Sequence, residues 1–396
     1  MALSLTWDVL HKNFMKSVPI WSSTFYFLFY AAAAALIPFL ALYYEHLGLS
    51  GGQIGLLLGI SPLITLFAAP FWTSLADVKH RHKTVLTVTM TAVVVVMLVF
   101  PSIKKPALLF LAVSLFALFS ASIIPLMDSA TMSMLGGQKD QYGRIRLFGT
   151  IGWGVTAPIA GAVLQGCGLQ WSFWIYAALM FVALFIGRQL IFAPAHTEAS
   201  FRHGVRTLLT DRRWVLFLLM VFMTGIGSSA ISTYLSVLME SMKATKTLIG
   251  LALTVSTISE LPIMFFSNLL LRRLKARGLL ILAMAIVGIR CLLYYFVNTS
   301  GGVLAIQLLH GLTFPILWVA GVTHAAESAP AGLGATAQGV FSGTLLGFGA
   351  AAGSLLGGIL IDRLGPAGMF GVIGWVVLSS LVVFLFFERK FIRVVA

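Results

Sequence analysis

Four charged side chains lie well inside long apolar stretches of the sequence: two acids, Asp128 and Glu260, and two arginines, Arg146 and Arg290. If these stretches cross a bilayer, a charge near its centre costs at least about 2.5–3.5 kcal/mol, so each side chain is a candidate for function. Each half of the chain contributes one acid and one arginine, and the four charges sum to zero. If such an acid can separate from its arginine partner, it can take up a proton. Alternatively, each acid and arginine form a static ion pair with a purely structural role.

A second group of polar and aromatic residues shares one predicted helix face. Gln307, His310, Phe314 and Trp318 are spaced at i, i+3, i+7 and i+11, so in a regular helix they lie within roughly 80° of one another. An amide, an imidazole and two aromatic rings on one face suit a cavity wall that binds a hydroxylated or aromatic solute. The alternative is a histidine that is hydrogen-bonded within a packed core.

Arg146 and Trp153 are seven residues apart and also share a helix face. An arginine beside an aromatic ring can grip a carboxylate, a sugar hydroxyl or a ring. The pair is therefore a candidate for substrate binding, although Trp153 taken alone is equally compatible with packing or with a position facing lipid.

Motifs of enzymes are missing from the sequence. There is no HExxH, no Walker loop, no GxSxG with partners and no cluster with metal-ligand spacing. The two cysteines, Cys167 and Cys291, fit neither a disulfide framework nor a metal site. We therefore expect no catalysis, no cofactor, no metal and no intrinsic use of ATP.

The composition explains which elements must hold these residues. Of 396 residues, 59% are hydrophobic and only 10% are charged, and the mean hydropathy is +0.99. A soluble domain is usually near a quarter charged, so a water-soluble globule is excluded. The net charge of +14 would suggest nucleic acid in a soluble protein, but no basic arm or recognition helix is present. The composition therefore indicates an integral membrane protein, and we expect it to bind no nucleic acid.

Apolar runs long enough to span a bilayer recur along the whole chain and predict an all-α protein with twelve transmembrane helices. The runs cover 18–43, 50–75, 84–103, 106–134, 146–165, 171–194, 213–240, 246–271, 278–297, 302–326, 337–361 and 366–387. A polar, basic interval at 195–212 divides them into six plus six. We therefore expect a six-helix half over 1–194, a linker over 195–212 and a second half over 213–396. This pattern is typical of a duplicated transporter bundle, the alternative being a chance even division of an ordinary bundle.

The loops predict an orientation in the membrane. Loops on the side of the two termini hold most of the Lys and Arg residues, among them Lys12, Lys16, Lys139, Arg202 and Arg206. Because basic loops stay in the cytoplasm, we expect both termini and the linker to be cytoplasmic. The expected location is the plasma (inner) membrane of a bacterium.

Several segments together match a known family. They are Ile37-Pro38-Phe39, GLSGGQIG at 48–55, Pro125 with Asp128, YGRIRLFGTIGW at 142–153, ISELPIMFFSNLLLRR at 258–273 and IQLLHGLTFP at 306–315. Over essentially its whole length the chain resembles the major facilitator superfamily, in the branch of phenylpropionate permease-like proteins and, more distantly, lactose permease. The resemblance implies the major facilitator fold of two six-helix halves.

The resemblance to lactose permease also implies roles in binding and coupling. Its sugar-binding carboxylate, arginine and tryptophan match Asp128, Arg146 and Trp153. Its eighth-span glutamate, ninth-span arginine and tenth-span histidine match Glu260, Arg290 and His310.

This chain departs from that pattern around the histidine. Thr313 stands where the proton-releasing glutamate is expected, and Gln307 stands where a lysine is expected. A coupled proton would therefore have to be carried by Asp128 or Glu260, with Arg290 as the charge that resets it.

A gating loop after the second run is a partial match to the superfamily pattern of glycine, acid and basic residues. Asp77 keeps the acid and Lys83 the final base, but Thr73 and His80 replace glycines. We expect residues 73–77 to form a degenerate gating loop, the alternative for Asp77 being a solvated loop acid.

These observations predict a secondary transporter that works by alternating access and needs no partner chain. Its substrate is expected to be a small polar or aromatic organic solute, such as a saccharide, nucleoside or aromatic acid, taken up with a proton. The predicted binding residues are Asp128, Arg146, Trp153, Gln307, His310 and Trp318, and the predicted coupling residues are Asp128, Glu260 and Arg290. A proton-antiport exporter of amphipathic compounds is the first alternative, and a receptor or membrane enzyme on a transporter scaffold is the second.

Overall fold

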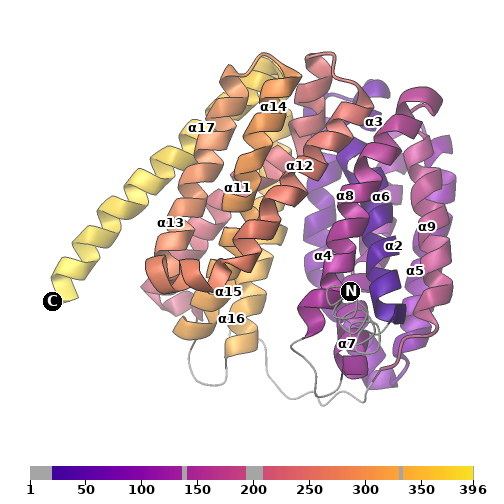
Figure 1. Cartoon of the computed structure of the whole chain (residues 1–396), viewed down its shortest axis with the longest axis horizontal. Coiled ribbons are helices and arrows are strands. Elements are labelled where there is room, and N and C mark those ends of the chain that lie inside the picture. The colour runs from indigo at the N-terminus through magenta and orange to yellow at the C-terminus, as the bar shows by residue number, and fades with distance from the viewer. Residues whose placement is uncertain (1–19, 136–140, 193–207, 330–332, 396) are drawn as a thin grey trace, which may run out of the picture. The chain divides into compact units, whose positions relative to one another are not determined.

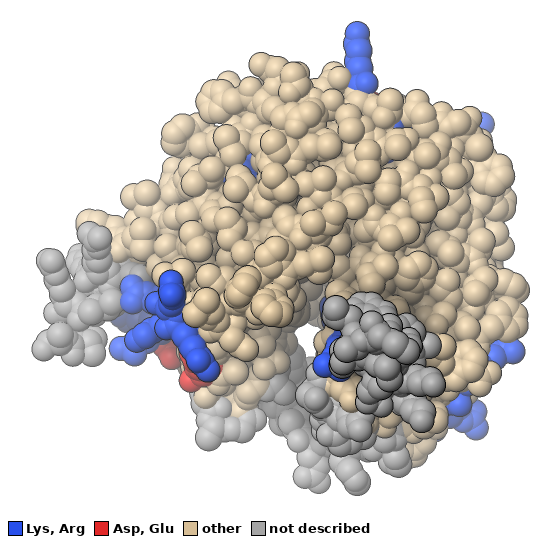
Figure 2. All heavy atoms as spheres, in the orientation of Figure 1, with Lys and Arg blue, Asp and Glu red and all other residues tan. Residues whose placement is uncertain are grey.

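The computed structural model describes residues 20–135, 141–192, 208–329 and 333–395, without the side chains of Ala335 and of residues 387–395. This part of the chain consists of helices joined by short connections, without strands (Figure 1). Apolar runs form helices in a membrane because a helix satisfies its backbone N–H and C=O groups within the segment. Most of the face in Figure 2 is uncharged, and the Lys and Arg side chains lie mainly near its edges.

The chain folds into two compact units, of which the first comprises residues 1–37 and 67–197. Its helices are α2 (Ile20–Leu36), the second part of α4 (Gly51–Lys79), α5 (His82–Val99), α6 (Pro106–Ser120), α7 (Ile123–Leu135), α8 (Tyr142–Cys167) and α9 (Trp171–Gly187), with the 3-10 turn η2 (Phe100–Ser102). Helices α2 and α8 lie very close together, since a Cβ atom on Gly152 would come within 2.4 Å of the Phe27 carbonyl oxygen. The close approach brings the rings of Tyr26 and Tyr142 to a centroid distance of 6.5 Å.

The second unit comprises residues 38–66 and 198–396. Its elements are α3 (Leu40–His46), which follows the 3-10 turn η1 (Ile37–Phe39), the first part of α4, α11 (Arg212–Ser241), α12 (Lys246–Phe265), α13 (Ser267–Phe296), α14 (Ser300–Gln307), η4 (Leu308–Leu312), α15 (Phe314–Ser328), α16 (Gly334–Ser342), the π-helix η5 (Gly343–Gly349) and α17 (Ala350–Val395). Two of these helices are interrupted. Non-helical backbone occurs at Lys275 in α13, with φ 56°, and at Gly365 in α17, with φ 71°. Pro366 follows Gly365 and cannot donate a helical hydrogen bond there.

The predicted spans correspond well to the helices. Ten helical segments of the described chain are long and apolar enough to cross a membrane, and α9 is a shorter apolar helix. Each expected range overlaps at least one of these segments, and the last two both fall on Thr336–Phe386, which is interrupted at Gly365. The all-α membrane fold is thereby confirmed, and the count of twelve stays a prediction.

Parts of two other predictions lie outside the described residues. These are residues 195–207 of the expected linker, and Lys12, Lys16, Lys139, Arg202 and Arg206 of the orientation argument. The boundaries 1–194, 195–212 and 213–396 and the cytoplasmic termini therefore stay predictions.

Within the second unit, the start of α4 is fixed against α17. The Asp362 carboxylate accepts hydrogen bonds from the amides of Gly51, at 2.6 Å, and of Gly52, at 2.8 Å. A Cβ atom on Gly55 would come within 2.6 Å of the Ser354 carbonyl oxygen, so the two backbones nearly touch. A carboxylate is favourable here because the first amides of a helix have no partner within the helix and carry partial positive charge.

Candidate functional site

The first unit holds a cluster built around Asp128 of α7. Asp128 Oδ2 lies 3.9 Å from Arg146 Nη1, and the Tyr142 hydroxyl donates to Asp128 Oδ1 at 3.0 Å. The Tyr26 hydroxyl, from α2, donates to the same oxygen. Arg146 in turn donates to the hydroxyls of Tyr142, at 3.1 Å, and of Tyr30, at 3.5 Å. The predicted pairing of acid and arginine is therefore present, with phenols around it.

Local helix geometry explains part of this arrangement. Tyr142 and Arg146 are four residues apart in α8, so their side chains lie on one face. The side chains of Arg146 and Asp128 are 46% and 32% exposed, which leaves both accessible to a solute. Trp153 lies half-buried seven residues beyond Arg146 on the same helix. The cluster can thus donate and accept hydrogen bonds and offers both charges.

The second unit holds a cluster in which His310 stands between the acid and the arginine. His310 Nε2 lies 2.9 Å from Glu260 Oε1, and His310 Nδ1 lies 3.1 Å from Arg290 Nη1. A guanidinium can only donate hydrogen bonds, so Nδ1 accepts, and the ring proton resides on Nε2, which donates to Glu260. Glu260 and Arg290 are therefore connected through an imidazole.

Arg290 is enclosed by neutral hydrogen-bond acceptors. It is 1% exposed, and it donates to Thr313 Oγ1 at 2.9 Å, Tyr294 Oη at 3.0 Å and Gln307 Oε1 at 2.6 Å. Its Nε atom has no partner within the described residues. Glu260 and His310 are more accessible, with side chains 27% and 25% exposed. The acid and the imidazole can therefore exchange with a solute or water, whereas the arginine is internal.

The expected polar face over Gln307, His310, Phe314 and Trp318 is interrupted. Helix α14 ends at Gln307, the 3-10 turn η4 follows, and Thr313 has φ −109° and ψ −91° before α15 begins. Pro315 explains the break, because it lacks an N–H group and disfavours helical backbone at the residue before it. The prediction of one continuous face is therefore wrong.

The four residues of that face divide into two pairs, with Gln307 and His310 at Arg290 and Phe314 against Trp318. Gln307 is 2% exposed and also donates to the Ala252 carbonyl oxygen at 3.2 Å, so it holds Arg290 in place. Phe314 and Trp318 still share a face of α15, with ring centroids 6.1 Å apart, and Trp318 lies 5.8 Å from Phe341. The substrate-binding roles expected for Gln307, His310 and Trp318 stay predictions.

The expected gating loop at residues 73–77 is helical, because α4 continues to Lys79 and the connection to α5 is His80–Arg81. Asp77 lies 2.7 Å from His82 Nε2, and the buried His82 ring stacks on Phe192 at a centroid distance of 5.2 Å. Lys83 donates to the Arg188 carbonyl oxygen at 3.2 Å. Asp77 and Lys83 thus flank the α4–α5 connection, and their gating role stays a prediction.

Sequence reasoning assigned no role in these clusters to four tyrosines and a threonine that contact the charged residues: Tyr26, Tyr30, Tyr142, Tyr294 and Thr313. The spacing of four residues between Tyr142 and Arg146, and between Arg290 and Tyr294, could have indicated two of them. Tyr26 and Tyr30 come from a different helix from the residues they contact, and no local pattern marks them.

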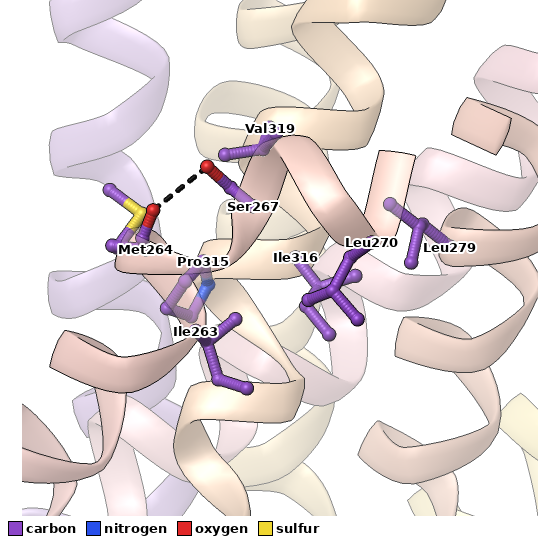
Figure 3. A pocket seen from close by; sticks show the side chains of 8 residues that line it. All are labelled: Ile263, Met264, Ser267, Leu270, Leu279, Pro315, Ile316 and Val319. Atoms are coloured by element: carbon purple, nitrogen blue, oxygen red, sulfur yellow. Dashed lines mark hydrogen bonds between the residues drawn. The ribbon is translucent and has the colours of Figure 1, made fainter. Parts of the chain in front are cut away.

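A small hollow lies beside the break between α12 and α13 (Figure 3). Its lining is Ile263, Met264, Ser267, Leu270, Leu279, Pro315, Ile316 and Val319. The Ser267 hydroxyl donates to the Met264 carbonyl oxygen at 2.8 Å, so the one polar side chain of the lining is engaged. The lining of this hollow includes no charged group, in contrast to the two charged clusters.

Comparisons with known proteins agree with this picture. Residues 20–372 match the MFS_1 like family. The chain is 26% identical over 340 residues to an uncharacterized transporter, YwbF, of Bacillus subtilis (strain 168), covering 85% of each chain. It is 27% identical over 341 residues to the maltose permease of Geobacillus stearothermophilus, covering 86% of each. The crystal structure of the nucleoside transporter NupG has the same fold, with a TM-score of 0.82 at 16% identity over 92% of this chain and 98% of that chain.

Proposed function

This chain belongs to the MFS_1 like family, and from that membership we propose that it couples the uptake of a small, neutral, hydroxylated solute to the entry of a proton. The matched relatives are transporters of the major facilitator superfamily, so the chain is a multi-pass membrane secondary transporter and not an enzyme.

The balance of charge in the clusters supports a neutral solute. In the first cluster Asp128 already balances the charge of Arg146, so Arg146 offers no uncompensated positive charge to an aromatic acid. A neutral solute with hydroxyl groups can instead donate to Asp128 and accept from Arg146. The maltose permease among the relatives supports a saccharide as first candidate, and the fold shared with NupG makes a nucleoside the second.

The proposal assigns different tasks to the two clusters. Arg146 is nearly half exposed and is therefore available to a solute, with Trp153 as an aromatic neighbour on the same helix. Glu260 accepts from a single described side chain, His310, and is partly exposed, so it is suited to take up and release the proton. Arg290 would favour release of that proton through its contact with His310.

Transport assays on the purified full-length chain in vesicles test the proposal. With maltose and uridine as probes, solute addition to a lightly buffered suspension should raise the external pH as protons enter with the solute. Glu260→Gln should abolish uphill accumulation and leave exchange of labelled for unlabelled solute, while Asp128→Asn should abolish both. Glu240→Gln, which changes an acid paired with His46 and Lys246, is the matched control and should keep coupling.

Two outcomes would contradict the proposal. If Glu260→Gln and Asp128→Asn both leave uphill accumulation intact, proton coupling does not pass through these acids. If vesicles of defined orientation empty rather than fill under an inward proton gradient, the protein is an antiport exporter.

The proposed location is the plasma membrane of a bacterium, with both termini cytoplasmic. The basic residues at the α4–α5 connection, Lys79, Arg81 and Lys83, support the orientation, since basic loops stay in the cytoplasm. Labelling of single cysteines introduced at Arg81 and at Lys104 from outside intact cells tests it. Labelling of position 104 alone is expected, and labelling of position 81 alone would reverse the orientation.

A further inference from the structure

The hydroxyl of Tyr142 bridges the acid and the arginine of the first cluster. It donates to Asp128 Oδ1 at 3.0 Å and accepts from Arg146 Nη1 at 3.1 Å. A direct contact between a carboxylate and a guanidinium has an N–O distance of about 2.7–2.9 Å, whereas Asp128 Oδ2 and Arg146 Nη1 are 3.9 Å apart. The ion pair is thus held open and is joined through a hydroxyl group.

The two oxygens of Asp128 are used unequally. Oδ1 accepts from both Tyr26 and Tyr142, whereas Oδ2 accepts no hydrogen bond from the described residues. The two terminal nitrogens of Arg146 also differ in their hydrogen bonds. Nη1 donates to Tyr142 at 3.1 Å, whereas Nη2 makes only a 3.5 Å contact with Tyr30. Oδ2 therefore remains available as an acceptor, Nη2 is only weakly engaged as a donor, and both atoms belong to partly exposed side chains.

We propose that Tyr142 sets this pair to recognise two adjacent hydroxyl groups, so that the solute is selected as a vicinal diol. One hydroxyl of the solute donates to Asp128 Oδ2, and its neighbour accepts from Arg146 Nη2 in place of Tyr30. The diol would thus connect Asp128 Oδ2 to Arg146 Nη2, just as the Tyr142 hydroxyl connects Asp128 Oδ1 to Arg146 Nη1. Tyr142 is a positioning residue, because it acts by holding Asp128 and Arg146 at the required separation.

Without the phenol, the carboxylate and the guanidinium can close into a direct contact. Phe at position 142 removes both hydrogen bonds of the bridge and leaves the ring in place. In the closed pair Arg146 Nη1 would occupy Asp128 Oδ2, the acceptor that the diol needs, and the separation between the two charges that admits the diol would be lost. The inference rests on the proposed function only in taking the solute to be hydroxylated, and it does not depend on proton coupling.

The test measures binding and transport of diols by the full-length chain in lipid nanodiscs and vesicles. The probes are maltose and uridine, each compared with an analogue that lacks one of two adjacent hydroxyls, 2′-deoxyuridine in the case of uridine. The test variant is Tyr142→Phe. The matched control is Tyr295→Phe, which removes a hydroxyl group from an exposed tyrosine of α13. A calorimetric titration without a proton gradient gives the affinities, and vesicle uptake gives KM and kcat.

For the probe that binds, the wild-type chain should bind the diol at least about tenfold more tightly than the deoxy analogue, as expected for one lost hydrogen bond. Tyr142→Phe should raise the dissociation constant and KM for the diol about tenfold, reduce the preference over the deoxy analogue to under about threefold, and leave kcat nearly unchanged. Tyr295→Phe should behave as the wild type. A merely structural role of Tyr142 would instead lower the folded fraction and leave KM and the preference intact.

The outcomes separate this inference from the proposed function. Equal binding of a diol and its deoxy analogue by the wild type overturns diol recognition without any variant. Wild-type affinity and preference in Tyr142→Phe overturn the role of Tyr142. If neither maltose nor uridine binds the wild type, the proposed hydroxylated solute is itself wrong, and the inference is overturned with it.

Discussion

Each unit of the molecule holds an acid and an arginine joined through a third side chain, and that third group differs. In the first unit a phenol, Tyr142, lies between Asp128 and Arg146. In the second an imidazole, His310, lies between Glu260 and Arg290. A phenol joins its two partners through one oxygen atom, whereas an imidazole joins them through two separate nitrogens, one of which donates to Glu260. In our proposal the first pair binds the solute, and Glu260 of the second pair holds the proton.

The two arginines differ as much as the bridging groups. The Arg146 side chain is 46% exposed, while Arg290 is 1% exposed and surrounded by neutral acceptors. An exposed arginine can change partners when a solute arrives, but a buried one cannot leave its partners without cost. Equal composition in the two units therefore does not imply equal environments for the matching residues.

The largest difference between the two clusters is expected in how the loss of each arginine changes the stability of the protein. Arg290→Met removes the donor to Thr313, Tyr294 and Gln307, and each buried group left without a partner costs about 1–3 kcal/mol. We expect a loss of more than about 3 kcal/mol, seen as a large fall in the thermal midpoint in detergent. Arg146→Met should unfold near the wild-type temperature and lose solute binding. Equal midpoints for the two variants would contradict the difference in burial.

A smaller effect is expected when the imidazole bridge is replaced. His310→Gln supplies a carbonyl oxygen for Arg290 and an N–H group for Glu260, so it keeps the connection without a titratable ring. Because Glu260 holds the proton in our proposal, His310→Gln should keep uphill accumulation within about threefold. His310→Phe, which breaks the connection, should lower it about tenfold or more. If His310→Gln fails as completely as His310→Phe, the proton is carried by the imidazole itself.

The smallest effects are expected at two tryptophans that were both predicted to bind solute. Trp318 lies against Phe314 and Phe341, so Trp318→Phe should lower stability by about 1 kcal/mol and leave KM unchanged. Trp153 shares a helix face with Arg146, so Trp153→Phe should raise KM roughly two- to fivefold at unchanged stability. Thermal unfolding and uptake kinetics of the two variants check this, and the reversed pattern would place solute at Trp318.

The sequence was sufficient for the features that depend on local patterns. Long apolar runs located the helices, and charges inside them located Asp128, Arg146, Glu260 and Arg290, because hydropathy and the cost of buried charge act residue by residue. Features that depend on contacts between helices could not be predicted from local sequence patterns. Tyr26 reaches Asp128 from another helix, and the break before Pro315 separates Gln307 from Phe314 although their spacing suggested one face. Residues 73–77 continue the helix α4 to Lys79, so the partial match to a gating-loop motif does not predict the backbone there.

The hydrogen bonds from Gly51 and Gly52 to Asp362 have a consequence for biosynthesis. Asp362 follows Gly51 by 311 residues, so α4 is made long before the carboxylate that completes its first turn. At about 5–20 residues per second the ribosome needs roughly 15–60 s to reach Asp362. During that time the start of α4 lacks its acceptor, and we expect nascent chains that end before Asp362 to be cleaved near Gly51 by added protease. The last spans thus finish a helix that was among the first to enter the membrane.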